Sequence, residues 1–339
     1  MVQYDRELNF LARLIQSIGE ANLPVAPVSI TNLYVSLKSK PLALLVGPKD
    51  KPKEAFLKLF NAALTGQSPH QCQTMAGHAW WAAQTDNVAR FTQAQTAFNE
   101  EKISALLSEA SQAENAHQVF IACLMKISPA ELEGCFASLA GLIQGKKVLP
   151  LPGNYYWPPI RYPPNLLVTG TMDAGLFRGY ETDLLSKTTV LTGTFDDPPK
   201  PYFAPFIPNA PEKHALNTSI RDEASAYTHL YRIPGWHARC LKPALEVIST
   251  LLKHDIPLQT RRVTREVLIY LANSWSVAGN GLFARSFYNN LDTALDLAIS
   301  QILLTRGWEA IRHSPPLRQA VEAVLDKRFT RSHRFIVDT

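Results

Sequence analysis

Residues 40–64 limit the fold of this chain more than any other stretch. An uninterrupted apolar run, Leu42–Val46, leads into Gly47 and Pro48, and a polar turn follows. After the turn, apolar side chains return at helical spacing, at Phe56, Leu57, Leu59 and Phe60. A short apolar run without alternation is typical of a buried strand. The stretch therefore predicts a strand, a tight turn and an amphipathic helix, which together form a unit of an α/β fold.

The turn has the length of a phosphate-binding loop, which reads G-x-x-x-x-G-K-[ST] between a strand and a helix. Here the eight residues run from Gly47 to Glu54, with Lys53 at the lysine position. Pro52 replaces the second glycine, and it has no N–H group to donate to a phosphate. Glu54 stands where a hydroxyl would meet magnesium, and its charge beside phosphate oxygens would cost on the order of a few kcal/mol. The frame of a nucleotide site is kept, but its chemistry is removed.

A second interpretation of the same turn needs no phosphate site. Proline is favoured in the first turn of a helix, and an acidic side chain there interacts favourably with the helix dipole. In that case Pro52 and Glu54 are ordinary first-turn residues of an ordinary strand–turn–helix unit. These residues by themselves leave both interpretations open.

Composition indicates a folded cytoplasmic protein. The chain has 339 residues, of which 46% are hydrophobic and 19% charged, which is enough for a sizeable core and two domains. Its net charge of +5 permits contact with nucleic acid without requiring it. The charged N-terminus lacks a signal-peptide core, and no apolar run reaches membrane-spanning length. We therefore expect no membrane contact. The four cysteines have no metal-ligand spacing, so we also expect reduced thiols and no metal site.

Strands alternate with helices in the first part of the chain, and only helices are predicted in the last part. Further apolar runs predict strands at 71–83, 119–125, 165–170 and 188–194. Helical spacing predicts helices at 3–20, 30–37, 86–113, 128–142, 221–231, 237–254, 260–278, 287–305 and 315–328. A proline-rich linker, 196–211, separates the two parts. We therefore predict an α/β fold followed by an all-α region, with domains at 1–205 and 206–339.

Five stretches, in this order along the chain, resemble motifs of one family. They are Leu33–Pro48, His117–Leu142, Leu166–Asp173 (LLVTGTMD), Leu184–Leu191, and Arg262–Leu271 with 292–332. In the same order, they are similar to the segments of AAA+ ATPases that carry Walker A, Walker B, sensor 1, the arginine finger and the helical lid. Within the AAA+ ATPases, they most resemble the branch of the McrB-type GTPase and its MoxR-like relatives. The resemblance implies an AAA+ parallel-sheet domain with a C-terminal helical lid domain.

The same resemblance implies a nucleotide site whose chemical groups have been replaced. The Walker B Asp, Glu and Asn positions correspond to Cys123, Leu124 and Lys126. The sensor-1 asparagine corresponds to Asp173, and the arginine finger corresponds to Lys187. With the changes in the loop, these replacements remove the magnesium ligand and the general base. No catalytic residue is then expected, and the vestigial nucleotide-binding residues are Gly47, Lys53, Asp173 and Lys187.

Aromatic and basic residues elsewhere are candidates for contacts with nucleic acid or a protein partner. They are Tyr156, Trp157, Arg161, Arg262, Arg265 and Arg331. The first three lie in a proline-rich connector and interleave aromatic rings with a cation, as a surface for single strands would. The next two fall where the family's lid carries a sensor-2 arginine, and the last belongs to a basic C-terminal run. Packing of the connector and solvation of the helix end are the alternatives.

The resemblance implies a catalytically inactive AAA+-like subunit, a structural, scaffolding or regulatory component of a prokaryotic complex in defence against foreign DNA. It would need no cofactor, and its partners would be other protein subunits, among them an active AAA+ ATPase or a nuclease effector. Two alternatives stay open. One is a degenerate motor subunit that still binds ATP or GTP without magnesium, which retention of Lys53 and Lys187 favours. The other is a nucleic-acid-binding module that uses the aromatic connector and the basic C-terminus.

Overall fold

The computed structural model describes residues 5–23, 25–48, 52–66, 68–77, 88–128, 162–177, 188–192 and 219–338, together with residues 139, 143 and 216. In the first part of the chain the elements are α1 (Arg6–Glu20), α2 (Pro27–Ser39), β1 (Leu42–Gly47), α3 (Lys53–Thr65), β2 (Cys72–Ala76), α5 (Val88–Ala110), η1 (Ala113–Asn115), β3 (Phe120–Ile127), β4 (Leu166–Asp173), η2 (Ala174–Leu176) and β5 (Thr188–Thr192). The helical region that follows contains α8 (Glu223–Tyr231), η5 (His237–Leu241), α9 (Lys242–Lys253), α10 (Thr260–Asn273), α11 (Phe287–Ala298), η6 (Ile299–Leu303), η7 (Leu304–Gly307), α12 (Trp308–His313), α13 (Pro315–Val324) and α14 (Thr330–Asp338).

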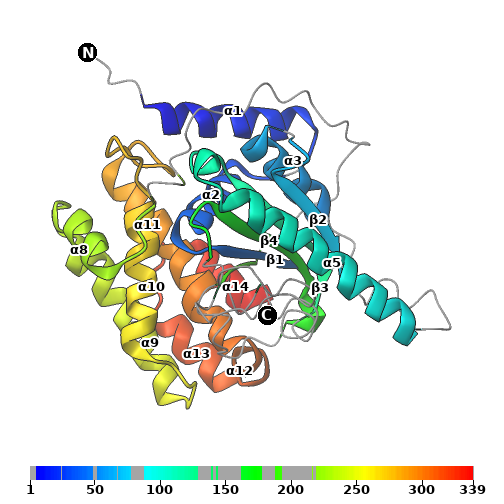
Figure 1. Ribbon diagram of the computed structural model, residues 1–339. Coiled ribbons are helices and arrows are strands. Elements are labelled where there is room, and N and C mark those ends of the chain that lie inside the picture. The colour runs from blue at the N-terminus through cyan, green and yellow to red at the C-terminus, as the bar shows by residue number, and fades with distance from the viewer. Residues whose placement is uncertain are drawn as a thin grey trace.

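The strands form one five-stranded sheet in the order β2-β3-β4-β1-β5, and every described pair is parallel. β1 lies between β4 and β5, and all six of its residues are buried, as its uninterrupted apolar run predicts. The helical region lies to one side of this sheet (Figure 1). The prediction of an α/β fold followed by helices is therefore confirmed.

Helices cover both faces of the sheet. Ala43 and Leu45 of β1 belong to a core that includes side chains of α1, α2 and α3. Leu42 and Leu44 point the opposite way, into a smaller core that includes α5. Because successive side chains of a strand alternate between faces, an apolar residue at every position of β1 requires cover on both sides. Among the described residues, no helix is both long enough and apolar enough to cross a membrane.

Local signals explain where several helices begin and end. Asp5 caps α1 by accepting hydrogen bonds from the backbone N–H groups of Glu7 and Leu8. α2 begins at Pro27, earlier than predicted, because proline is well tolerated at a first helical position. α3 ends at Thr65, and Gly66, the next residue, adopts a left-handed φ of 60°. The helix predicted at 128–142 lies largely outside the described residues.

The prediction that the helix at 260–278 continues to residue 278 is wrong. α10 ends at Asn273, and residues 274–282 form a tight loop closed by an antiparallel bridge between Trp275 and Gly281. A Cβ atom on Gly281 would lie 2.4 Å from the carbonyl oxygen of Ala284, so the close approach requires glycine. The apolar period continues past residue 273, and helical spacing alone does not reveal the loop.

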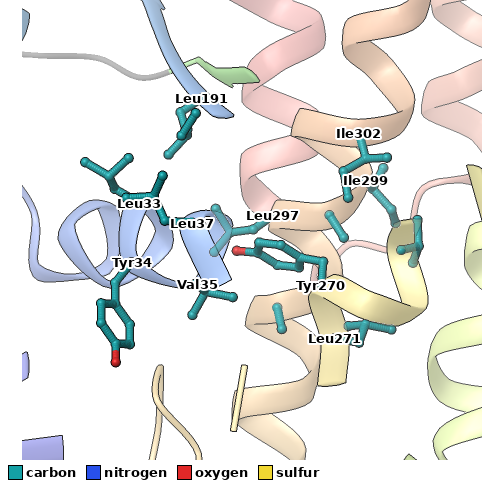
Figure 2. Packing of buried hydrophobic residues seen from close by; sticks show 14 of the residues in the cluster. Leu33, Tyr34, Val35, Leu37, Leu191, Tyr270, Leu271, Leu297, Ile299 and Ile302 are labelled. Atoms are coloured by element: carbon teal, nitrogen blue, oxygen red, sulfur yellow. The ribbon is translucent and has the colours of Figure 1, made fainter. Parts of the chain in front are cut away.

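One continuous core joins the helical region to the sheet. Leu33 and Leu37 of α2 lie beside Tyr270 and Leu297, which come from α10 and α11, while Leu191 comes from β5 (Figure 2). The hydroxyl of Tyr270 donates to the Oδ1 atom of Asn32 at 2.5 Å in this core. The predicted domain boundary between residues 205 and 206 lies outside the described residues, but the core itself has no break between the two parts.

A buried ion triad crosses the same junction. Glu266 of α10 lies 2.6 Å from the ammonium of Lys40, just before β1, and 2.7 Å from the guanidinium of Arg306 in η7. Lys40 also donates to the carbonyl oxygen of Thr188 in β5. Burial lowers the pKa of Lys40 to about 8 against the attraction of Glu266. Burial would raise the pKa of Glu266, but the attraction of Lys40 and Arg306 outweighs it and lowers that pKa.

A second buried cluster ties α1 and α2 to the loop after α10. The ammonium of Lys38 lies 2.7 Å from the Oε1 atom of Glu7 and donates to the carbonyl oxygen of Trp275. The Oε2 atom of Glu7 accepts from the backbone N–H of Val277. The Oδ2 atom of Asp5 accepts from the side chains of residues 276 and 280 in the same loop. Three segments far apart in the sequence are thus held together by buried charges.

The triad makes Glu266 the residue whose loss should loosen this junction most. We expect Glu266→Ala to reduce the free energy of unfolding by about 3–5 kcal/mol, since it leaves two cations buried without their carboxylate. The exposed carboxylate Glu322 on α13 supplies the control, and Glu322→Ala should change stability by less than about 0.5 kcal/mol. Urea unfolding of both variants measures the difference. A loss below about 1 kcal/mol for Glu266→Ala would show that the triad does not hold the junction.

Candidate functional site

The candidate site lies at the carboxyl edge of the sheet, where ligands bind in open parallel sheets. Gly47, the last residue of β1, pairs in register with Asp173, the last residue of β4. α3 begins at Lys53, after a turn of which residues 49–51 lie outside the described part of the chain. The structure therefore brings three of the predicted vestigial residues, Gly47, Lys53 and Asp173, to one edge. The fourth, Lys187, lies outside the described residues.

The ammonium group of Lys53 is turned back onto the chain. Its side chain is buried, and its Nζ atom donates to the carbonyl oxygen of Gly47 at 3.1 Å and to that of Pro48. An ammonium group has three donors and no acceptor, so two of its three donors face carbonyl oxygens of the turn. An anion that approached this lysine would have to displace those backbone contacts. Lys53 therefore stabilises the turn that a phosphate would otherwise occupy.

Glu54 is joined to the ends of β3 and β4 through Thr171. The Oγ1 atom of Thr171 lies 3.4 Å from the Oε1 atom of Glu54, at the long end of the hydrogen-bond range, and 4.0 Å from the Sδ atom of Met125. The same Oγ1 atom accepts a hydrogen bond of 2.9 Å from the backbone N–H of Lys126. A carboxylate, a hydroxyl and a thioether thus meet at this end of the sheet. Among them, only the carboxylate is a favourable ligand for magnesium.

Asp173 is engaged in a local turn. Its Oδ1 atom accepts from the backbone N–H of Gly175 at 2.8 Å and caps η2. The side chain is partly exposed. The carboxylate can accept further hydrogen bonds but cannot donate one while it is ionised. It would repel a phosphate at this edge, where the family's asparagine would donate to it.

Cys123, which the resemblance matches to the Walker B aspartate, lies well before the carboxyl end of β3. Cys123 pairs with Thr169 of β4, and Thr169 pairs with Ala43 of β1, four residues before Gly47. At about 3.3 Å per residue, Cys123 lies about 13 Å short of the carboxyl edge. Burial raises the pKa of its thiol to about 12, so the thiolate is disfavoured, as expected for a residue inside an apolar strand.

Met125 and Lys126 occupy the end of β3 instead. The pairing of β3 with β4 shifts between Leu124 and Ile127, and Lys126 adopts a left-handed φ of 54° at this irregularity. Its side chain is exposed. The end of β3 therefore carries a thioether and a cation, and β3 contains no carboxylate.

The predicted contacts for nucleic acid or a partner that the structure describes all lie in the helical region. Arg262 lies 3.8 Å from Glu266 and Arg331 lies 3.8 Å from Asp296, so the contacts that the structure shows for both lie within the helical region. Arg265 is exposed on α10. The aromatic connector with Tyr156, Trp157 and Arg161 lies outside the described residues. Among the residues that the structure describes, no group of three or more His, Cys, Asp or Glu side chains could hold a metal ion.

The sequence analysis did not include Thr169 and Thr171 in the site, although one feature of the sequence could have indicated them. Thr169 and Thr171 are polar residues inside an apolar strand and are fully buried, so each needs a polar neighbour. The partner of Thr169 is the side-chain amide of Asn61 on α3, and that of Thr171 is the end of β3. Which neighbour each hydroxyl meets depends on strand order and register, which a single sequence does not reveal.

Acidic substitutions test the register of β3. Cys123→Asp should reduce the free energy of unfolding by more than about 3 kcal/mol, because it buries a carboxylate without a cationic partner. Lys126→Glu places its carboxylate at the exposed end of the strand and should cost less than about 1 kcal/mol. Cys123→Ser controls for loss of the thiol. Equal stability of the Cys123→Asp and Lys126→Glu variants in urea would contradict this register.

Comparison with known proteins does not assign the chain to a family. No family model matches the sequence, and no curated protein matches it either. The polar side chains described at this edge, Lys53, Asp173 and Thr171, each have hydrogen-bond partners within the protein.

Proposed function

We propose that this chain is an AAA+-like protein that does not hydrolyse nucleotide and that acts as a structural or regulatory subunit of a protein complex. The observation that carries the proposal is the position of Lys53, whose ammonium group donates to the carbonyl oxygens of Gly47 and Pro48. In a working phosphate-binding loop this lysine reaches toward the phosphates. Here its contacts close the turn.

The strand order supports the AAA+ part of the proposal. β1, whose end resembles the start of Walker A, lies between β4, which resembles the sensor-1 strand, and β5. β4 in turn separates β1 from β3, which resembles the Walker B strand. A parallel sheet with these three strands side by side is compatible with the parallel-sheet domain that the resemblance implies. Many functions share one fold, so strand order supports the family proposal and not an activity.

The groups at the carboxyl edge support the loss of hydrolysis. Glu54 occupies the position of the hydroxyl that would bind magnesium. Met125 lies near the end of β3, where an acidic residue would be needed. Lys126 then stands in place of a general base. A lysine in that place cannot accept the proton of an attacking water while it is charged. Metal binding and water activation are therefore both disfavoured by residues of this chain.

The junction between sheet and helical region supports a static role. A motor that couples hydrolysis to movement requires its lid to rotate against the sheet domain about a hinge. In this chain Glu266 binds Lys40 across that junction and Arg306 within the helical region, and the surrounding core is continuous. Rotation would separate buried charges, which is costly in a low-dielectric interior. A fold held in this way is suited to present fixed surfaces to other subunits.

Titration calorimetry with ATP and with GTP, each with and without magnesium, tests the proposal on the full chain. We expect no heat of binding and no change in melting temperature, because Lys53 is engaged and Glu54 repels the phosphates. The control is a Pro52→Gly, Glu54→Ser variant, which removes the two obstacles in the turn. Micromolar binding by the natural chain that requires magnesium would overturn the proposal in favour of an active or neighbour-assisted motor.

Replacement of Lys53 separates a structural lysine from a functional one. Lys53→Met should reduce the free energy of unfolding by about 1–3 kcal/mol, since it leaves buried carbonyl oxygens without this donor. A lysine kept only for ligand binding would give the opposite result, because replacing such residues leaves stability unchanged or increases it. Lys58→Met, on the exposed side of α3, is the matched control and should be nearly neutral.

A further inference from the structure

β2 lies at one edge of the sheet, and part of its backbone points away from the sheet. Among the described strands, β2 pairs with β3 alone. The carbonyl oxygen of Gln71 and the N–H group of Gly77, on either side of β2, both bond to β3, so the odd-numbered residues direct their backbone groups toward β3. Because these groups alternate in direction along a strand, those of Thr74 and Ala76 point outward.

Two side chains of α5 bond to this outer edge. α5 packs against β2 and β3 (Figure 1). The Nζ atom of Lys102 donates to the carbonyl oxygen of Thr74 at 3.0 Å, and the Nδ2 atom of Asn99 donates to that of Ala76 at 3.4 Å. Within the described part of the chain, the N–H groups of Thr74 and Ala76 have no hydrogen-bond partner. Side chains therefore occupy the acceptors of this edge, while its donors stay open.

An exposed aromatic ring lies beside the same edge. Phe98 is 52% exposed, and the Nζ atom of Lys102 lies 4.5 Å from its ring centroid. The same Nζ atom bonds to Thr74, so the ring, the ammonium group and the strand edge belong to one surface. We call Thr74, Ala76, Phe98 and Lys102 the β2 edge surface.

The charge of Lys102 has no counterpart in the described part of the chain. Its ammonium group forms no ion pair there, and residues 68–77, which include β2, contain no Lys, Arg, Asp or Glu. Glu100 and Glu101 precede it in α5, but helix geometry places them about 200° and 100° away around the axis. A carboxylate supplied by a partner would therefore meet a cation without an ion pair beside an uncharged strand.

Protection of the edge does not account for all of these groups. A lysine at an edge strand discourages pairing with another chain. Protection of that kind needs no exposed phenylalanine, and it leaves the N–H groups of Thr74 and Ala76 without acceptors. Both features suit a surface that is covered when a partner binds.

We propose that the β2 edge surface binds an extended segment of a partner protein, which adds a strand to the sheet beside β2. Carbonyl oxygens of the segment accept from Thr74 and Ala76, and its N–H groups replace Lys102 and Asn99 at the outward carbonyl oxygens. Lys102, once released, pairs with an acidic side chain of the segment. Addition of a strand to an exposed edge is a recurring mode of peptide recognition.

The spacing on α5 defines the segment further. Phe98 and Lys102 are four residues apart, which is about 6 Å along a helix and close to the ~6.7 Å between residues i and i+2 of a strand. An apolar side chain two residues from the acidic one would therefore cover Phe98. β3 and β4 separate β2 from β1 and its turn, so this inference does not depend on the state of the nucleotide site.

Fluorescence anisotropy of the full chain with a labelled peptide, Thr-Val-Thr-Glu-Thr-Val-Thr-Thr, provides the test. A valine lies two residues from the glutamate on both sides, so the peptide fits in either direction. We expect saturable binding, and hydrogen exchange of residues 72–76 should slow because the open N–H groups become paired. N-methylation of two adjacent central residues of the peptide blocks a bond to β2 whichever way the strand faces, and should weaken binding about tenfold.

Variants of the chain separate the ring from the charge. Phe98→Ala should weaken binding about fivefold or more, because the apolar side chain of the peptide loses its contact. Lys102→Glu should reverse the preference, so that a peptide with lysine in place of glutamate binds more tightly. Tyr288 is the matched control, since it is 47% exposed and the guanidinium of Arg239 lies 4.8 Å from its ring centroid. Tyr288→Ala should leave affinity within about twofold.

Thermal melting should confirm that every variant is folded. No binding of the peptide at about 1 mM, or equal binding by the natural chain and Phe98→Ala, would overturn the proposal. A preference of the natural chain for the lysine peptide would overturn it as well. Self-association that is lost in Phe98→Ala, without binding of the peptide, would assign the edge to pairing between two copies and overturn the proposal too.

Discussion

The carboxylate of Glu266 is the interaction on which the arrangement of this molecule depends. It neutralises Lys40 and Arg306, and Lys40 also reaches Thr188 at the sheet edge, so one buried charge joins β1, β5, α10 and η7. A buried ion triad is not by itself a source of stability, because desolvation offsets much of the attraction. Its effect is on specificity. Any packing of the helical region that moved Glu266 would leave cations buried without a carboxylate, and that penalty selects the observed arrangement.

At the carboxyl edge of the sheet, too, the polar groups are paired within the protein. A phosphate site must keep donors free in the absence of ligand, which costs stability in the unliganded protein. Here Lys53 donates to the turn, Asp173 caps η2, and Thr171 accepts from the end of β3. These polar groups are bonded locally instead of being directed toward a ligand. Hydrogen bonds of this kind contribute to the stability of this edge of the sheet in the absence of any ligand.

Sequence reasoning predicted the elements of the fold well and the register of the site poorly, for physical reasons. The buried run of β1 and the cap of α1 are local signals, and both are present in the structure. The position at which β3 ends cannot be deduced from the residues of β3 alone. Its apolar pattern continues through Cys123, Leu124 and Met125, and only pairing with β4 shows that the edge lies beyond Cys123. The bonds of Lys53 to its own turn were also beyond prediction, since the sequence shows that a lysine is present but not where its ammonium points.

Rigidity at the junction bears directly on the proposed role. α10 carries Glu266 and Tyr270 into the junction with the sheet, where they contact Lys40 and Asn32. Two sites influence each other only when both bias an element that has two arrangements. Movement of α10 against the sheet would separate Glu266 from Lys40, which is costly in a low-dielectric interior. A subunit held in this way would present the same surfaces whatever nucleotide its neighbours bind, which distinguishes a fixed scaffold from a motor whose surfaces follow its nucleotide state.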